Sequence, residues 1–171
     1  KPNYRKLHRK PVPVIGGLAV AITITIAVFL FSLTRSFFTN APALPICLVV
    51  MLLTGLWDDR KNISPRLRLL VQLACAMAIA SSGIRITSLY GIFGIGSIPL
   101  IAQYMLTTII ITGTTNAFNL MDGIDGLAGG LAVMITGLLA VLAFVLSLHA
   151  LALFLLIVTA AVAGFLRFNL H

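Results

Sequence analysis

Residues 126–168 read GLAGGLAVMITGLLAVLAFVLSLHALALFLLIVTAAVAGFLRF, an almost unbroken apolar stretch that decides the fold class of this chain. A helix needs about 20 predominantly apolar residues to cross the hydrocarbon core of a bilayer, and this stretch is about twice that long. The point best suited to a reversal of the chain lies around His149. We therefore predict two membrane-spanning helices, at 126–147 and 150–168, joined by a tight turn.

The composition of the whole chain also indicates a membrane protein. Of its 171 residues, 60% are hydrophobic and 9% are charged, and the mean hydropathy is +1.10. A soluble domain has roughly 25% charged residues. The net charge of +8 could suggest nucleic acid, but the basic residues form short clusters between apolar runs rather than one interleaved basic surface. We therefore predict a lipid bilayer as the surroundings and no nucleic-acid partner.

Four further apolar segments of suitable length come earlier in the chain, at 14–33, 41–57, 67–83 and 99–118. The prediction is thus an all-α polytopic membrane protein with about six transmembrane helices, which form a single membrane domain over residues 1–171. Between the third and fourth segments, residues 84–98 alternate apolar with polar residues and contain three glycines. This pattern predicts a small extracytoplasmic hairpin.

The basic residues predict the orientation in the membrane. Ten of the twelve lysines and arginines flank one side of the predicted spans: Lys1, Arg5, Lys6, Arg9, Lys10, Arg60, Lys61, Arg66, Arg68 and Arg167. Arg35 and Arg85 lie on the other side. Because cytoplasmic loops are enriched in lysine and arginine, we predict that both ends of this chain face the cytoplasm.

The four acidic residues all lie at predicted cytoplasmic ends of spans, in two separate loops. The first pair is Asp58 and Asp59, directly after the second span. Two adjacent carboxylates at the C-terminal end of a helix are opposed by the helix dipole, by several tenths of a kcal/mol each. Such a placement favours a functional role. The alternative interpretation is a solvated helix end balanced by Arg60 and Lys61.

The second acidic segment reads NAFNLMDGIDG, and its polar residues recur at every third position: Asn116, Asn119, Asp122 and Asp125. In a regular α-helix each step of three drifts by about 60°, so these groups converge on one ligand only if the helix tightens or unwinds near Gly123. The glycines that follow either permit this break or let helices pack closely in lipid.

Oxygen ligands of this kind suit Mg²⁺, with Mn²⁺ as an alternative. Because Mg²⁺ is usually held by one or two carboxylates together with substrate phosphates, the segment predicts a phosphorylated substrate from the cytosol. Five basic residues then have two interpretations, as topology signals or as groups that bind phosphate or anionic lipid headgroups: Lys6, Arg9, Lys10, Arg60 and Arg66.

Several motifs occur in the order typical of one family. They are KPN at 1–3 followed by PVPVIGG at 11–17, WDDR at 57–60, and NAFNLMDGIDGLAGG at 116–130. In these motifs the chain resembles the polyprenyl-phosphate N-acetylhexosamine-1-phosphate transferases, and it is nearer to the branch that uses UDP-GlcNAc than to the muramoyl-pentapeptide transferases. These membrane enzymes start cell-envelope glycans such as cell-wall polymers or lipopolysaccharide.

The resemblance implies transfer of N-acetylhexosamine 1-phosphate, here GlcNAc 1-phosphate, from a UDP-sugar to undecaprenyl phosphate, with release of UMP and with Mg²⁺ as cofactor. It implies a multi-pass protein of the bacterial inner membrane and leaves a homodimer open. Asp58 and Asp59 would be catalytic, one of them activating the attacking phosphate oxygen. The remaining candidates would bind substrate (Asn116, Asn119, Asp122, Lys10 and Arg60) or metal (Asp122 and Asp125).

The chain also departs from the family pattern. A further cytoplasmic loop with a glycine-aspartate motif and a later histidine-rich loop do not occur within residues 1–171. We therefore expect this stretch to be part of a longer protein and to be inactive on its own. Two alternatives stay open: a truncated, non-catalytic remnant, and a cation-coupled transporter, which acids at the midplane of the bilayer would favour.

Overall fold

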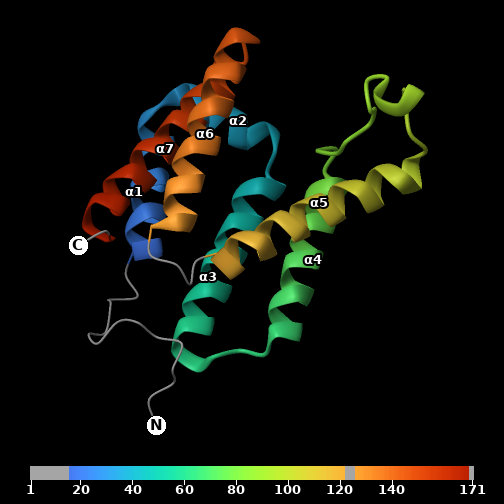
Figure 1. Ribbon diagram of the computed structural model, residues 1–171. Helices are drawn as coiled ribbons and strands as arrows, with labels where there is room; N and C mark the ends of the chain where they lie inside the picture. The colour runs from blue at the N-terminus through green and yellow to red at the C-terminus, as the bar shows by residue number, and fades with distance from the viewer. Residues whose placement is uncertain (1–15, 122–125, 170–171) are drawn as a thin grey trace.

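The computed structural model describes residues 16–121 and 126–169, and within these ranges the chain forms seven α-helices and one 3₁₀ turn, with no extended strand (Figure 1). The predicted all-α class is therefore confirmed. The helices are α1 (Gly16–Leu30), α2 (Ser32–Asn40), α3 (Ala43–Lys61), α4 (Pro65–Ser81), α5 (Leu100–Met121), α6 (Leu127–Val145) and α7 (His149–Asn169), and the 3₁₀ turn η1 is Ile92–Gly94.

The helices are arranged in two groups (Figure 1). In the first group α7 packs against α1, α2 and α6, and in the second α4 packs between α3 and α5. The groups meet where α5 contacts α6 and where α1 contacts α3. The turn between α3 and α4 lies at the opposite end of the molecule from the α6–α7 turn and the η1 loop (Figure 1). Two of the three predicted outer connections therefore lie at the same end.

The α6–α7 hairpin reverses where the sequence predicted. Ser147 adopts the left-handed conformation, with φ 59°. The N–H of Leu148 donates to the carbonyl of Ala143 over 2.8 Å, and the N–H of Ser147 donates to that of Phe144 over 3.0 Å. This pair of bonds closes the end of α6 as a Schellman motif. Both helices are long and apolar enough to cross a membrane.

The chain bends within the first predicted span, 14–33, where α1 ends at Leu30. Residues 34–40, which separate the first two predicted spans, are helical in α2, which follows α1 at an angle of 101°. Phe31 is extended at the bend, with φ −99° and ψ 112°. The fully buried hydroxyl of Thr34 donates to the carbonyls of Phe31 and Val28 over 2.8 and 3.2 Å. The carbonyl of Phe31 also accepts the N–H of Arg35 over 3.2 Å, so the Thr34 hydroxyl links the last turn of α1 to the first turn of α2.

By length and composition, two helices qualify as membrane spans among the described residues, or three if the bent α1–α2 pair counts as one. The other predicted spans coincide with α3, α4 and α5 to within a few residues. However, α3 ends in a charged turn, α4 has only 17 residues, and α5 contains many threonines and asparagines. The structure supports a multi-pass membrane protein but does not confirm six spans.

The connection between α4 and α5 contains one isolated antiparallel bridge, between Ser88 and Ser97. Because its described residues form no extended strands, the predicted hairpin is not confirmed. Arg85 anchors this connection to α5. Its Nε donates to Oε1 of Gln103 over 2.9 Å, and its guanidinium lies 5.2 Å from the centre of the Tyr104 ring.

Candidate functional site

The aspartate pair lies inside the last turn of α3. The helix continues past Trp57, the predicted end, to Lys61. Asn62 then ends the helix in the left-handed conformation, with φ 48°, and its N–H donates to the carbonyl of Asp58 over 2.7 Å. The Asp58 side chain is half-buried, whereas Asp59 is exposed. The carboxylates therefore belong to a regular helix end and not to the following loop.

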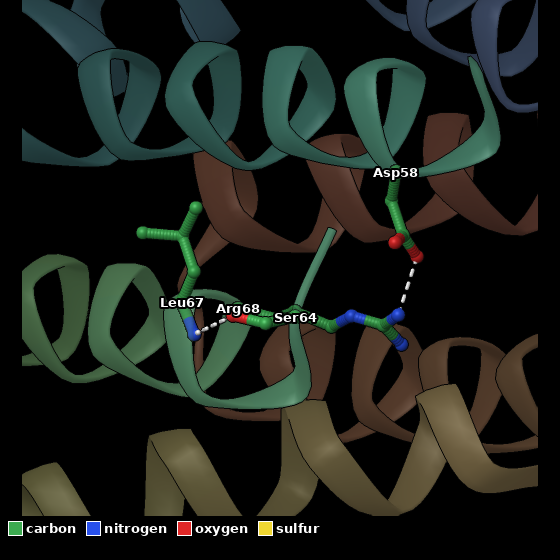
Figure 2. Close-up of polar contacts among 4 residues, drawn as sticks. All are labelled: Asp58, Ser64, Leu67 and Arg68. Carbon is green, nitrogen blue, oxygen red and sulfur yellow. Dashed lines mark hydrogen bonds and ion pairs between the residues drawn. The ribbon is translucent and has the colours of Figure 1, made fainter. Parts of the chain in front are cut away.

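The turn that follows fixes where α4 begins. Ser64 is the N-cap, and its hydroxyl oxygen accepts a hydrogen bond from the N–H of Leu67 over 3.3 Å (Figure 2). Pro65 occupies the first helical position, where its fixed φ is already helical and its missing N–H is not needed. This short, capped connection sets α4 beside α3, with the first turn of α4 opposite the last turn of α3.

An ion pair joins the two helix ends. Nη2 of Arg68 lies 2.5 Å from Oδ2 of Asp58, and the two side chains are 29% and 22% exposed (Figure 2). Among the residues that the structure describes, the buried Nε of Arg68 has no hydrogen-bond partner, and neither has the buried Oε1 of Gln72, one turn further along α4. Because the pair is largely removed from water, its Coulomb attraction is stronger than that of a pair on an open surface.

Arg68 is the residue that the sequence interpretation missed, since it was counted only as a topology signal. A signal was present nevertheless. In a helix starting at Pro65, Arg68 shares one face with Gln72, Cys75 and Ala76, at spacings of four, seven and eight residues. The last three of these are buried. The pattern therefore indicated that Arg68 points towards neighbouring helices.

Arg60 and the two asparagines are exposed. Arg60 lies in the last turn of α3, where a cation complements the negative end of the helix dipole. Asn116 and Asn119 lie in the last two turns of α5, which is an unbroken α-helix as far as Met121. Among the described residues, no hydrogen bond joins Asp58 to either asparagine. The structure thus keeps the predicted catalytic pair and the predicted substrate-binding asparagines on separate helix ends.

A groove of about 360 Å³ lies between α1, α5, α6 and α7. Its lining includes Gly16 and Gly17 from α1, Asn119 from α5 and Gly129 from α6. These residues come from the first and last sequence motifs, which are about a hundred positions apart in the chain. The groove therefore brings together the two motifs in space and presents the exposed amide of Asn119 next to them.

Two of the motif glycines also have a packing role. A Cβ atom on Gly16 would lie 2.3 Å from Cε2 of Phe165, and one on Gly129 would lie 3.0 Å from the side chain of Leu166. These positions let α7 approach α1 and α6 closely, as small residues do in membrane helix pairs. At Gly126 the backbone itself favours glycine, because φ is +73° where α6 begins.

The predicted metal ligands Asp122 and Asp125, and the predicted phosphate ligand Lys10, lie outside the described residues. In the part that is described, no group of three or more His, Cys, Asp or Glu side chains is arranged to hold a metal. The donor chemistry of Asp122 and Asp125 nonetheless fits Mg²⁺, which prefers carboxylate oxygens. In sequence these acids directly follow Met121, the end of the helix that presents Asn119 to the groove.

A family profile described as glycosyl transferase family 4 matches residues 41–171. The chain is 32% identical over 185 residues to the probable undecaprenyl-phosphate N-acetylglucosaminyl 1-phosphate transferase of Bacillus subtilis. The matched region covers 100% of this chain and 48% of that protein. It is 32% identical to the undecaprenyl-phosphate alpha-N-acetylglucosaminyl 1-phosphate transferase of Yersinia pestis and 31% identical to that of Escherichia coli K12, in each case over 99% of this chain and 46% of the relative.

The chain thus spans about half the length of these relatives. No solved structure matches it. The residues matched by the family profile include the Asp58–Asp59 pair, its partner Arg68 and the whole motif at 116–130. The resemblance drawn from the motifs is confirmed: the chain belongs to glycosyl transferase family 4.

Proposed function

We propose that the complete protein transfers N-acetylglucosamine 1-phosphate from UDP-N-acetylglucosamine to undecaprenyl phosphate and releases UMP, as the first membrane step of a cell-envelope glycan. The observation that carries this proposal is the similarity, over essentially the whole chain, to relatives named for undecaprenyl-phosphate N-acetylglucosaminyl 1-phosphate transfer. The half-buried carboxylate of Asp58, held by Arg68 at the end of α3, supports it.

In this reaction an oxygen of the lipid phosphate attacks the phosphorus that carries the sugar. The bond from that phosphorus to the bridging oxygen breaks, and the bridging oxygen leaves with UMP. A phosphomonoester has a second pKa of about 6, so the attacking phosphate is largely ionised at cytosolic pH. Correct positioning is then more important than a strong base. We assign this positioning to Asp58 and Asp59 and favour direct displacement over an aspartyl-phosphate intermediate.

The remaining candidates would act on the sugar nucleotide. Asn116, Asn119 and Asp122 would bind the donor, and Lys10 and Arg60 would bind phosphate groups. Asp122 and Asp125 would hold Mg²⁺, or alternatively Mn²⁺, which supplies neutralising charge between two anionic phosphates. The exposed amide of Asn119 in a groove lined by two sequence motifs supports this assignment.

The proposal includes a topology of six spans in the bacterial inner membrane, with the acids and both ends of this chain on the cytoplasmic side. The separation of the α3–α4 turn from the α6–α7 turn and the η1 loop supports it (Figure 1). The excess of basic residues beside the acids supports the same orientation.

The experiment is an assay of the full-length protein in membranes. UMP release from UDP-N-acetylglucosamine is expected only when undecaprenyl phosphate is present, together with exchange of radiolabelled UMP into UDP-N-acetylglucosamine. Asp58→Asn should lower both rates at unchanged protein level. A full-length protein that folds but shows neither release nor exchange would contradict the proposal and favour a transporter or a non-catalytic remnant.

A further inference from the structure

We propose that Arg68 is a positioning residue for the Asp58 carboxylate, an assignment that rests on the proposed function. The two side chains come from different helices and meet across the α3–α4 turn, with Nη2 of Arg68 2.5 Å from Oδ2 of Asp58 (Figure 2). A guanidinium is a planar donor group with a fixed geometry, so this contact restrains the rotation of the carboxylate as well as neutralising it.

Both charges stand at the unfavourable end of their own helix. Asp58 lies in the last turn of α3, where the helix dipole opposes a negative charge, and Arg68 lies in the first turn of α4, where it opposes a positive charge. Each residue is therefore disfavoured locally and stabilised by the other. An arrangement that conflicts with local preference on two elements at once is typical of a functional site.

The buried surroundings of Arg68 support a positioning role for its contact with Asp58. Within residues 16–121 and 126–169, its buried Nε has no hydrogen-bond partner, and the neighbouring buried oxygen, Oε1 of Gln72, has none either. Gln72 itself is only 3% exposed. The described part of the neighbouring helices thus offers Nε of the guanidinium no acceptor, whereas Nη2 pairs with Asp58. We infer that the helix packing fixes the orientation of the Arg68 guanidinium. The ion pair with Asp58 then restrains the orientation of the carboxylate.

Two substitutions in the full-length enzyme test this role. Arg68→Gln should lower kcat by about 10- to 100-fold, the usual effect of removing a group that orients a catalytic ligand, with KM for UDP-N-acetylglucosamine changed less than about twofold. Arg68→Lys should restore part of kcat, because the ammonium keeps the charge but not the planar fork. Arg35→Gln is the control: it removes the same charge from an exposed position on α2 and should leave kcat unchanged.

A double-mutant cycle separates positioning from a merely structural clamp between α3 and α4. If Arg68 acts through Asp58, the variant carrying both Asp58→Asn and Arg68→Gln should be no slower than Asp58→Asn alone, because residues that act as a unit are not additive. Independent effects that multiply would overturn the assignment. Rates are expressed per folded protein, and the thermal midpoint is measured for each variant. If Arg68→Gln does not accumulate, a lowered kcat in folded Arg68→Lys supports the role and a wild-type kcat overturns it.

The same data distinguish this inference from the proposed function. A folded wild-type enzyme that releases no UMP would overturn the proposed function, and the assignment of Arg68 with it. An active wild type, an inactive Asp58→Asn and an Arg68→Gln variant with wild-type kcat would overturn the positioning role alone.

Discussion

At the scale of single residues, threonine shows how polar groups are accommodated in these helices. The hydroxyls of Thr136 and Thr159 each donate to the carbonyl four residues earlier or share the 2.8 Å hydrogen bond between them. In contrast, Thr108 and Thr112 on α5 are buried with hydroxyls that have no partner among the described residues. Because an unpaired buried hydroxyl is costly, these two positions lower the stability that the packing of α5 provides.

The acids that follow α5 carry a prediction at this scale. Asp122→Asn and Asp125→Asn in the full-length protein should each lower UMP release and raise the Mg²⁺ concentration needed for half-maximal rate, because an amide binds Mg²⁺ less well than a carboxylate. The measurement is the rate of UMP release over a series of Mg²⁺ concentrations.

Asp58→Asn serves as the comparison, since Asp58 is paired with Arg68 and is assigned to the lipid phosphate. It should lower the rate with little change in the Mg²⁺ requirement. An unchanged Mg²⁺ requirement in both Asp122→Asn and Asp125→Asn would remove these residues from the predicted metal site.

Residue types and spacing were enough to select part of the candidate site. The pair at the end of α3 could be identified because adjacent aspartates oppose the helix dipole. The pairing of Asp58 with Arg68 was harder to predict, because a contact between two helices depends on the direction that the Ser64 cap gives to α4. The same limit applies to the groove, since no local pattern predicts that Gly16 and Asn119 lie in one lining.

At the scale of elements, the contact between α1 and α7 carries a second prediction. Gly16→Ala should destabilise the protein by about 1–3 kcal/mol, because the added methyl group overlaps the Phe165 ring and forces it to move. Gly17→Ala is the matched control in the same helix, where a Cβ meets no atom of the described residues within 4 Å. It should be neutral or stabilising, because alanine is favoured over glycine in a helix by roughly 0.5–1 kcal/mol.

The measurement is the thermal midpoint of the purified full-length protein in detergent. Equal midpoints for the two alanine variants would contradict this prediction, because they would show that α7 can move away from α1 without loss of stability.

The positions where helices begin or reverse could be predicted where local sequence determines them. The reversal between α6 and α7 follows from the length of the apolar stretch, and the start of α4 from the Ser-Pro pair. The bend at Phe31 could not be predicted, because neither proline nor glycine marks it. It is held by the Thr34 hydroxyl and by Phe37 and Phe38, whose rings pack against Phe154 of α7.

At the scale of the whole molecule, the proposed topology is tested by measuring which cysteines react with a reagent that cannot cross the membrane. Single cysteines replace Lys61, beside the acidic pair, and Thr87, in the connection before α5; both positions are exposed. An impermeant maleimide should label Thr87→Cys in sealed spheroplasts and Lys61→Cys only after the membrane is opened. The native thiols, Cys47 and Cys75, are buried and form the unlabelled background.

Labelling of Lys61→Cys in sealed cells would place the acidic pair outside and contradict the proposed orientation. Equal labelling of both positions before opening would contradict the separation of the two ends of the molecule.

The bend between α1 and α2 has a consequence for the lipid around the protein. Because α2 follows α1 at an angle of 101°, an α1 that crosses the bilayer directs α2 close to the plane of the membrane. The exposed Arg35 on α2 then lies near the lipid headgroups, where a long basic side chain is favoured over the hydrocarbon core. A change in the charge of these headgroups therefore acts first on α2, whose Phe37 and Phe38 rings pack against Phe154 of α7.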